Sequence, residues 1–232
     1  MMAAGLREAI ASAEIFKALG LETLNDLASF GAFRQFKKGE HVFYDRDSIS
    51  VVYLVSQGLV SMYKTNFLGE KRVIFILGPG QLIMEGVADK LSTSVNCEAF
   101  EDSGLICFNQ KKFLAAMKRD FELTKAVMES MSVRTRRLYR QLKNMSGSVR
   151  GDKRIAAKLW KLSRDHGLST EKGVRINLKL SVTCLANMMG AKRETISRQL
   201  KVLMDQNLVE VRNGTFTIPN PDRLADYFKS ES

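Results

Sequence analysis

The apolar residues between positions 180 and 203 recur at helical spacing in two blocks that Gly190 separates. The first block has Leu185, Met188 and Met189, and the second has Ile196, Leu200 and Leu203. Ser181 stands where an N-cap is expected, and Gly190 can adopt the left-handed conformation that ends a helix. The pattern predicts two short helices, the second starting near Lys192. Two helices broken in this way are typical of a helix-turn-helix, a DNA-binding motif.

Two short alternating runs follow the second helix, at Leu208–Val211 and Thr215–Ile218, joined by Arg212-Asn213-Gly214. Asn-Gly is favoured in two-residue hairpin turns because both positions need a positive φ. The pattern therefore predicts a β-hairpin directly after the second helix, in the position of a wing.

The second helix should carry its polar residues on the side opposite its apolar face. These residues are Arg193, Glu194, Ser197 and Arg198. Guanidinium donors and a carboxylate acceptor near the start of a helix suit the major groove, where base edges present a distinct hydrogen-bond pattern. We expect this group to contact bases. The residues expected to contact phosphates, which position the protein without specifying sequence, are Ser181, Thr183 and Lys201.

The first half of the chain has a different pattern. Residues 33–113 contain short apolar runs separated by glycines, and an amphipathic segment precedes them. The clearest runs are His41–Tyr44, Val51–Val55, Leu59–Lys64, Arg72–Leu77 and Leu105–Phe108, and the preceding segment has Leu6, Ile10, Ile15, Phe16, Leu19, Leu24 and Leu27. Short strands at regular spacing predict a sandwich or a barrel.

Residues 111–145 contain no Gly or Pro and predict a helix. Its apolar residues, spaced by three, four or seven, are Val127, Met131, Leu138, Leu142 and Met145. This stripe could rest on the chain's own barrel or pair with a second copy. We favour pairing, because helix-turn-helix proteins usually bind two half-sites with two-fold symmetry. Ser146-Gly147-Ser148 predicts a flexible link, and residues 154–162 predict a further helix.

Composition and charge narrow the class of protein. The chain has 232 residues and a formal net charge of +11, which is −1 over residues 1–117, +5 over 118–143 and +7 over 149–232. The basic excess therefore accompanies the helix-turn-helix and favours a polyanionic partner there. No apolar run could span a bilayer, no signal peptide is evident, and three scattered cysteines fit a reducing compartment. We expect a soluble, two-domain, cytoplasmic protein with no membrane partner.

The order of barrel, long helix, link and winged helix-turn-helix resembles the CRP/FNR family of bacterial transcription regulators. The resemblance covers nearly the whole chain and is most specific over Gly190–Arg198 and Asp205–Leu208. It implies an α+β fold with a jelly-roll (double-stranded β-helix) sensor domain over 1–117, a dimerisation helix over 118–145 and a winged helix-turn-helix domain over 146–232. It also implies a homodimer that binds double-stranded DNA, contacts RNA polymerase and responds to an effector at its N-terminal domain.

The recognition helix resembles two branches of this family. Arg193-Glu194 is similar to a pair in the cyclic-AMP receptor branch, and Glu194–Arg198 resembles the Glu-x-x-Ser-Arg pattern of the oxygen-responsive branch. The resemblance implies a TGA-like half-site core, in which Arg198 donates two bonds to guanine and Glu194 accepts one from the opposing cytosine. Ser197 would contact a neighbouring thymine, and Arg193 a second guanine or a phosphate.

The expected effector site departs from the family. The cyclic-AMP branch holds its nucleotide with a glutamate and a later Arg-Ser pair. Glu85 resembles the glutamate, but the pair's position falls at Thr93-Ser94, and no arginine occurs between Arg72 and Arg119. A buried phosphate would lack its bidentate charged partner, so we expect no conventional cyclic-AMP binding. Glu85 could instead bridge its own loop.

We predict no cofactor and leave the effector open. The iron-sulfur branch has an N-terminal cysteine cluster, whereas the first cysteine here is Cys97. The two histidines, His41 near the start of a strand and His166 in an expected loop, suit structural roles better than haem ligation. An apolar or weakly polar effector could lie against Met128 and Met131, although both methionines also fit a core.

Other hypotheses have less support. A ligand-binding signalling module without sequence-specific DNA binding would not need the winged motif. An enzyme is unsupported, because the sequence has no metal-ligand cluster, nucleophile with a histidine base, or phosphate-binding glycine-rich loop. Cys97 and Cys107 could meet across a sheet as a regulatory disulfide, whereas Cys184 fits a small apolar core residue.

Overall fold

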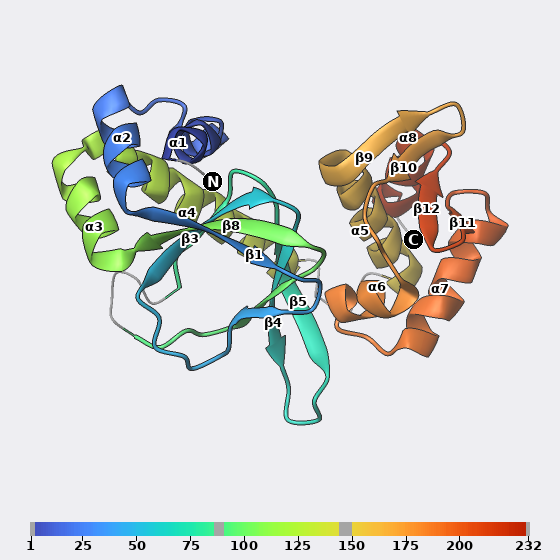
Figure 1. The fold of residues 1–232 in the computed structure, drawn as a ribbon. Helices are drawn as coiled ribbons and strands as arrows, with labels where there is room; N and C mark the ends of the chain where they lie inside the picture. The colour runs from blue at the N-terminus through green and yellow to red at the C-terminus, as the bar shows by residue number, and fades with distance from the viewer. Residues whose placement is uncertain (1–2, 86–90, 144–149, 231–232) are drawn as a thin grey trace. The chain divides into compact units, whose positions relative to one another are not determined.

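The protein is described by a computed structural model that places residues 3–85, 91–143 and 150–230 (Figure 1). The chain divides into two compact units. The first comprises Met1–Gly69 and Val73–Leu138, and the second comprises Tyr139–Ser232 with Glu70–Arg72. Among the described residues, no helix is long and apolar enough to cross a membrane.

The first unit is built around two four-stranded sheets with the orders β1-β8-β3-β6 and β2-β7-β4-β5. The strands are β1 (Gly31–Phe36), β2 (His41–Phe43), β3 (Val51–Gln57), β4 (Val60–Thr65), β5 (Lys71–Leu77), β6 (Leu82–Ile83), β7 (Asn96–Ala99) and β8 (Ser103–Asn109). This strand order is that of an eight-stranded jelly roll. The predicted fold is therefore confirmed, and each of the five clearest apolar runs overlaps a strand.

Strand β3 shows why the sheets stack as they do. Its side chains alternate between two cores, because successive residues of a strand point to opposite faces. Val52 and Leu54 pack with the helices, whereas Tyr53 and Val55 pack between the two sheets. The near-continuous apolar sequence of β3 thus reflects a strand that is buried on both faces.

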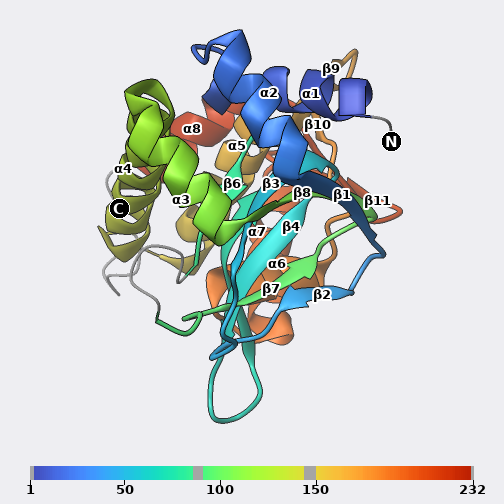
Figure 2. The same cartoon turned by 60° about the vertical axis from the view of Figure 1, so that its left-hand side comes forward.

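Helices cover one face of the β1-β8-β3-β6 sheet and bury Ile10, Phe16, Leu27 and Phe113 against it. They are α1 (Ala3–Ala11), the 3₁₀ turn η1 (Glu14–Phe16), α2 (Leu21–Phe30), α3 (Gln110–Arg119) and α4 (Phe121–Lys143). Figure 2 shows α1, α2 and α3 together above the strands, with the β4–β5 hairpin projecting at the opposite end of this unit.

The helix predicted over 111–145 is two helices. Its chain breaks at Asp120, whose carboxylate accepts the backbone N–H groups of Glu122 at 2.8 Å and Leu123 at 3.4 Å and so caps α4. Asp120 had no distinct signal in an otherwise helical pattern. Met145 and the predicted link Ser146-Gly147-Ser148 lie outside the described residues.

The second unit contains α5 (Gly151–His166), β9 (Gly167–Thr170), β10 (Gly173–Ile176), α6 (Val182–Met189), α7 (Arg193–Asp205), β11 (Glu210–Arg212), β12 (Thr215–Ile218) and α8 (Pro221–Lys229). Its sheet has the order β11-β12-β10-β9. The helix predicted over 154–162 is confirmed within α5. The prediction of a loop at His166 is wrong, because His166 is the last residue of α5 and Gly167 pairs with Ile176 in the sheet.

Candidate nucleic-acid interface and sensor pocket

Helix α6 has the start and the end that its sequence predicts. The Ser181 side chain accepts the backbone N–H of Cys184 at 3.0 Å and caps the first turn. Gly190 ends the helix in the left-handed region, at φ 61° and ψ 44°. These two residues fix the length of the first helix of the motif. Leu185, Ala186 and Met188 are buried on its inner face.

Helix α7 presents one polar face and one buried face. Ile196, Leu200 and Leu203 are at most 4% exposed. The candidate base-contacting residues, all exposed, are Arg193, Glu194, Ser197 and Arg198. They occupy the first two turns of α7, so the structure brings together two guanidinium groups, a carboxylate and a hydroxyl on one surface. Such a helix end can enter a major groove and offer both donors and acceptors to base edges.

The end of α7 accounts for the sequence Gln206-Asn207-Leu208. Asn207 adopts φ 53°, and the backbone N–H of Leu208 donates to the carbonyl of Leu203 at 2.9 Å. This pattern is a Schellman-type ending, in which Asn can replace Gly in the left-handed position. Leu208 is buried at 3% exposure and anchors the chain as it enters the wing.

The wing is the predicted hairpin. Strands β11 and β12 pair with Val211 opposite Phe216, and the turn residues Asn213 and Gly214 have φ of 50° and 73°. Positive φ at both turn positions is the conformation that matches the twist of a two-residue hairpin. Phe216 is buried and attaches the wing to the domain.

The candidate phosphate-contacting residues Ser181, Thr183 and Lys201 are all exposed. Ser181 and Thr183 lie at the start of α6, and Lys201 lies on α7. The Ser181 hydroxyl already serves as the helix cap. Any phosphate contact at Ser181 must therefore coexist with that intrahelical bond, a constraint that the sequence alone does not show.

A buried cluster of charged residues lies between the first turn of α5 and the end of α8, and the sequence did not predict it. Asp152, 5% exposed, accepts hydrogen bonds from Arg150 Nε at 3.2 Å and Arg150 Nη2 at 2.9 Å, and from the Tyr227 hydroxyl. Burial alone would raise the pKa of Asp152, but the hydrogen bonds from Tyr227 and Arg150 outweigh it and hold that pKa below its ordinary value. The nearby Lys153 donates to the Ser230 carbonyl at 2.6 Å. Together these bonds join the first turn of α5 to the end of α8.

In the jelly roll, the candidate effector residues are engaged with their own loops. Glu85 accepts a hydrogen bond from the Ser94 hydroxyl at 3.0 Å. Thr93 is 2% exposed, and its hydroxyl donates to the Tyr44 carbonyl and accepts from the Asp47 backbone N–H at 3.0 Å. The structure thus brings Glu85 and Ser94 together, while Thr93 holds the 44–47 loop.

Met128 and Met131 lie elsewhere, on an exposed stripe of α4. They are 58% and 45% exposed and are followed by Leu138 and Leu142 at heptad spacing. Val127, predicted on one stripe with Met131, is 2% exposed and belongs to the first unit's core. Assigning Val127 to the seam is therefore wrong, because the first part of α4 packs on the helix-covered face of the jelly roll and buries Val127 there together with Leu123.

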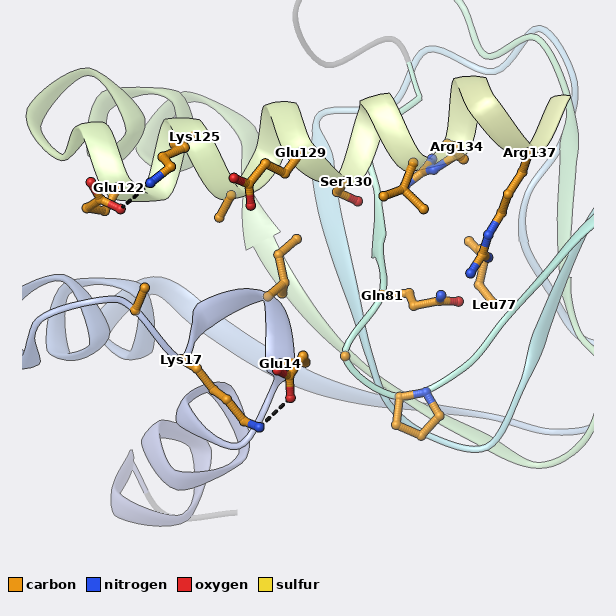
Figure 3. Close-up of a pocket in the computed structure, with 16 residues that line it drawn as sticks. Glu14, Lys17, Leu77, Gln81, Glu122, Lys125, Glu129, Ser130, Arg134 and Arg137 are labelled. Carbon is orange, nitrogen blue, oxygen red and sulfur yellow. Dashed lines mark ion pairs between the residues drawn. The ribbon is translucent and has the colours of Figure 1, made fainter. Parts of the chain in front are cut away.

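A pocket of about 640 Å³ lies between α4, η1 and the turn Pro79–Gln81, and we call it the α4 pocket (Figure 3). Charged residues of α4 line one wall. Two of its carboxylates are paired, Glu14 with Lys17, and Glu122 with Lys125 at 3.5 Å. Met128 and Met131 do not line it.

Two arginines occupy the other end of the α4 pocket. Arg134 donates to the backbone carbonyl of Leu82. Burial lowers the pKa of Arg134, Glu85 opposes that shift, and the like charge of Arg137 adds to it. Arg134 lies outside residues 73–118, in which the sequence has no arginine, and reaches the barrel from α4, so its position along the chain did not indicate this contact.

Among the described residues, none of the three cysteines, Cys97, Cys107 and Cys184, forms a disulfide. Cys97 lies on β7 and Cys107 on β8, which are strands of different sheets. Burial first, then nearby carboxylates, raises the pKa of Cys97 to about 12, and burial raises that of Cys107 to about 11. Such thiols are poor nucleophiles, which weighs against a regulatory disulfide. His41 contacts the Tyr63 hydroxyl at 2.6 Å and stacks on Tyr44, which fits a structural role.

Comparisons with known proteins agree with both units. Residues 33–120 match the model of a cyclic nucleotide-binding domain, and residues 153–227 match that of a Crp-like helix-turn-helix domain. The chain is 28% identical over 205 residues to the cyclic AMP receptor protein of Thermus thermophilus, which covers 88% of this chain and 91% of that protein. It is 24% identical over 222 residues to the global nitrogen regulator of Synechocystis sp., covering 93% and 95%.

The fold is also shared with solved structures. FixK2 from Bradyrhizobium japonicum matches with a TM-score of 0.75 at 19% identity, over 87% of this chain and 99% of that one. At this identity the likeness concerns the fold alone. It agrees with the jelly roll, long helix and helix-turn-helix described above.

Proposed function

This chain belongs to the CRP/FNR family of DNA-binding transcription regulators, and on that premise we propose that it recognises palindromic DNA as a homodimer through α7. The observation that carries the proposal is the exposed polar face of α7, opposite the buried Ile196, Leu200 and Leu203. Arg198 would donate two bonds to guanine and Glu194 would accept one from the opposing cytosine, in a TGA-like half-site core. Ser197 would meet a neighbouring thymine, and Arg193 a second guanine or a phosphate.

A gel-shift experiment tests this assignment. Arg198→Ala should lower affinity for a TGA-core palindrome by about 10- to 100-fold, the loss expected for one bidentate base contact. Arg223→Ala removes the same charge from the exposed surface of α8 and is the matched control. Replacing the core guanine by 7-deazaguanine should weaken the native protein but not the Arg198→Ala variant. An equal loss of DNA affinity in Arg198→Ala and in the control Arg223→Ala would refute base recognition by Arg198.

The dimer is proposed to form along α4, with Met128, Met131, Leu138 and Leu142 as its seam, because this exposed stripe has heptad spacing. We propose a functional division into a sensor over 1–117, a dimerisation helix over 118–145 and a reading domain over 146–232. Contact with RNA polymerase, residence in the cytoplasm and the lack of catalysis are proposed from family membership. The alternative of a signalling module without DNA binding does not account for the helix-turn-helix match at 153–227.

Conventional cyclic AMP is not the proposed effector. Glu85 accepts a hydrogen bond from Ser94, and the Thr93 hydroxyl is hydrogen-bonded to the 44–47 loop. Neither side chain can make the bidentate, charge-assisted hydrogen bonds to a phosphate that an arginine would supply. Calorimetric titration with cyclic AMP should therefore show no binding at micromolar concentration. Tight binding would overturn this part of the proposal.

A further inference from the structure

We propose that the α4 pocket binds a small organic anion, with Arg137, Arg134 and Gln81 holding its carboxylate or phosphate. This inference rests on the proposed function, because it names the class of effector that the sensor domain would take. At about 640 Å³ the pocket lies within the range of roughly 300–1,000 Å³ typical of small-molecule sites.

The charges of the pocket are unevenly balanced. Two of its carboxylates, Glu14 and Glu122, already have lysine partners. Within the described part of the chain, no ion pair involves Arg134 or Arg137, which lie one turn apart on α4. Figure 3 shows Arg137 reaching from α4 toward Gln81 and Leu77, away from the end that holds the two lysine–glutamate pairs. One end of the pocket therefore carries two guanidinium groups that make no ion pair with a described residue, and Glu85, which attracts Arg134, does not line the pocket.

The donors at this end are held in place. One N–H of the Arg134 guanidinium donates to the backbone carbonyl of Leu82. This bond fixes the position of the guanidinium and leaves its other N–H groups as donors. The side-chain oxygen Oε1 of Gln81 accepts the backbone N–H of Gly78 at 3.0 Å, so the side-chain nitrogen Nε2 of Gln81 remains a donor. Two guanidinium groups repel each other in a partly buried site, and an anion between them would convert that repulsion into charge-assisted hydrogen bonds.

The rest of the lining selects the body of the ligand. Ile15, Leu77 and Val133 contribute apolar surface suited to a short hydrocarbon or aromatic body. Glu129 also lines the pocket and makes no ion pair among the described residues. Its carboxylate disfavours a second anionic group at the ligand's other end. The fitting ligand is a monofunctional anion with an apolar body.

This site is distinct from the loop in which the family resemblance places an effector. That loop contributes Glu85 and Ser94, which are bonded to each other and do not line the α4 pocket. Half of the lining residues belong to α4. A bound anion would therefore hold α4 against η1 and the Pro79–Gln81 turn, on the helix that also carries the proposed dimer seam.

Calorimetry on the full chain without DNA tests the site. The probes are benzoate and phenyl phosphate, with inorganic phosphate and terephthalate as comparisons. Arg137→Gln should weaken binding of the two monofunctional probes at least about tenfold, because it removes a charge-assisted contact. Arg136→Gln removes the same charge from the neighbouring, exposed residue outside the pocket and should change binding by less than about twofold.

The outcomes separate the alternatives. Absence of binding by both probes at millimolar concentration, or equal weakening by both variants, would overturn the site. Inorganic phosphate binding as tightly as phenyl phosphate would indicate an adventitious ion only, and terephthalate binding as tightly as benzoate would overturn the role of Glu129. Gel shifts with and without probe then test regulation: binding at Arg137 that leaves DNA affinity unchanged would overturn the effector role. If no palindrome is recognised at all, the proposed function fails while calorimetry still decides the pocket.

Discussion

Replacing Tyr227 with Phe removes one hydroxyl from the charge cluster that joins α5 to α8. In the native domain this hydroxyl donates to the Asp152 carboxylate, which is nearly inaccessible to water and is otherwise bonded to Arg150. Phenylalanine preserves the ring. The variant therefore removes one hydrogen bond to a buried charge, together with the bond between this hydroxyl and the Gln206 side chain.

The expected cost follows from that geometry. A hydrogen bond to a charged group contributes about 1.5–3 kcal/mol to stability. Because Arg150 still donates twice to Asp152, we expect the lower part of this range, about 1.5–2 kcal/mol. That loss lowers the ratio of folded to unfolded domain by about 10- to 30-fold.

Urea unfolding followed by tryptophan fluorescence measures the effect. Trp160 is the single tryptophan, and it lies on α5 with its ring 5.8 Å from that of Phe228, so its emission reports on the second unit. Tyr139→Phe is the matched control, because Tyr139 is 65% exposed. A destabilisation below about 0.5 kcal/mol, or one equal to that of the control, would refute the argument.

The pH dependence provides a second check. The pKa of Asp152 is held below its ordinary value of 3.8 by the bonds from Tyr227 and Arg150, despite the opposing effect of burial. A carboxyl group whose pKa is lower in the folded than in the unfolded state stabilises the fold at pH values above its pKa in the unfolded state. This stabilisation is lost as the pH falls through the pKa of the folded state. The stability difference between native protein and Tyr227→Phe should be full at pH 7 and shrink below about pH 4. A difference that is constant down to pH 3 would contradict this account.

Two further predictions concern the dimer and the DNA interface. Met131→Glu should convert the dimer into a monomer at micromolar concentration, as measured by chromatography with light scattering, because it places like charges opposite each other in the seam. Ser132→Glu, at the neighbouring exposed position, should leave the dimer intact. A dimeric Met131→Glu protein would exclude this seam. Ser181→Ala should destabilise the second unit by about 1 kcal/mol through loss of the α6 cap. Ser181→Asp should keep the cap but weaken DNA binding by charge repulsion, and unchanged affinity would remove Ser181 from the phosphate contacts.

Much of the recognition motif is local and could be predicted from the sequence. The cap at Ser181, the left-handed Gly190 and the Asn213-Gly214 turn depend on interactions within a few residues. The jelly roll was also predictable as a class, since its strands are bounded by turn residues. The break at Asp120 was not, because a capping aspartate inside a polar helical sequence looks like an ordinary exposed residue.

Periodicity alone determined the two helices of the helix-turn-helix, the strands of the wing and the strand-rich first half of the chain, since those patterns require only the geometry of a single helix or strand. Tertiary structure decided which apolar residues of α4 are core and which are exposed, separating Val127 from Met128. It also joined Asp152 to Tyr227 across 75 positions and brought Arg134 to the carbonyl of Leu82, 52 positions away. Such contacts depend on how distant segments pack, and the spacing of residues along the chain carries no information about them.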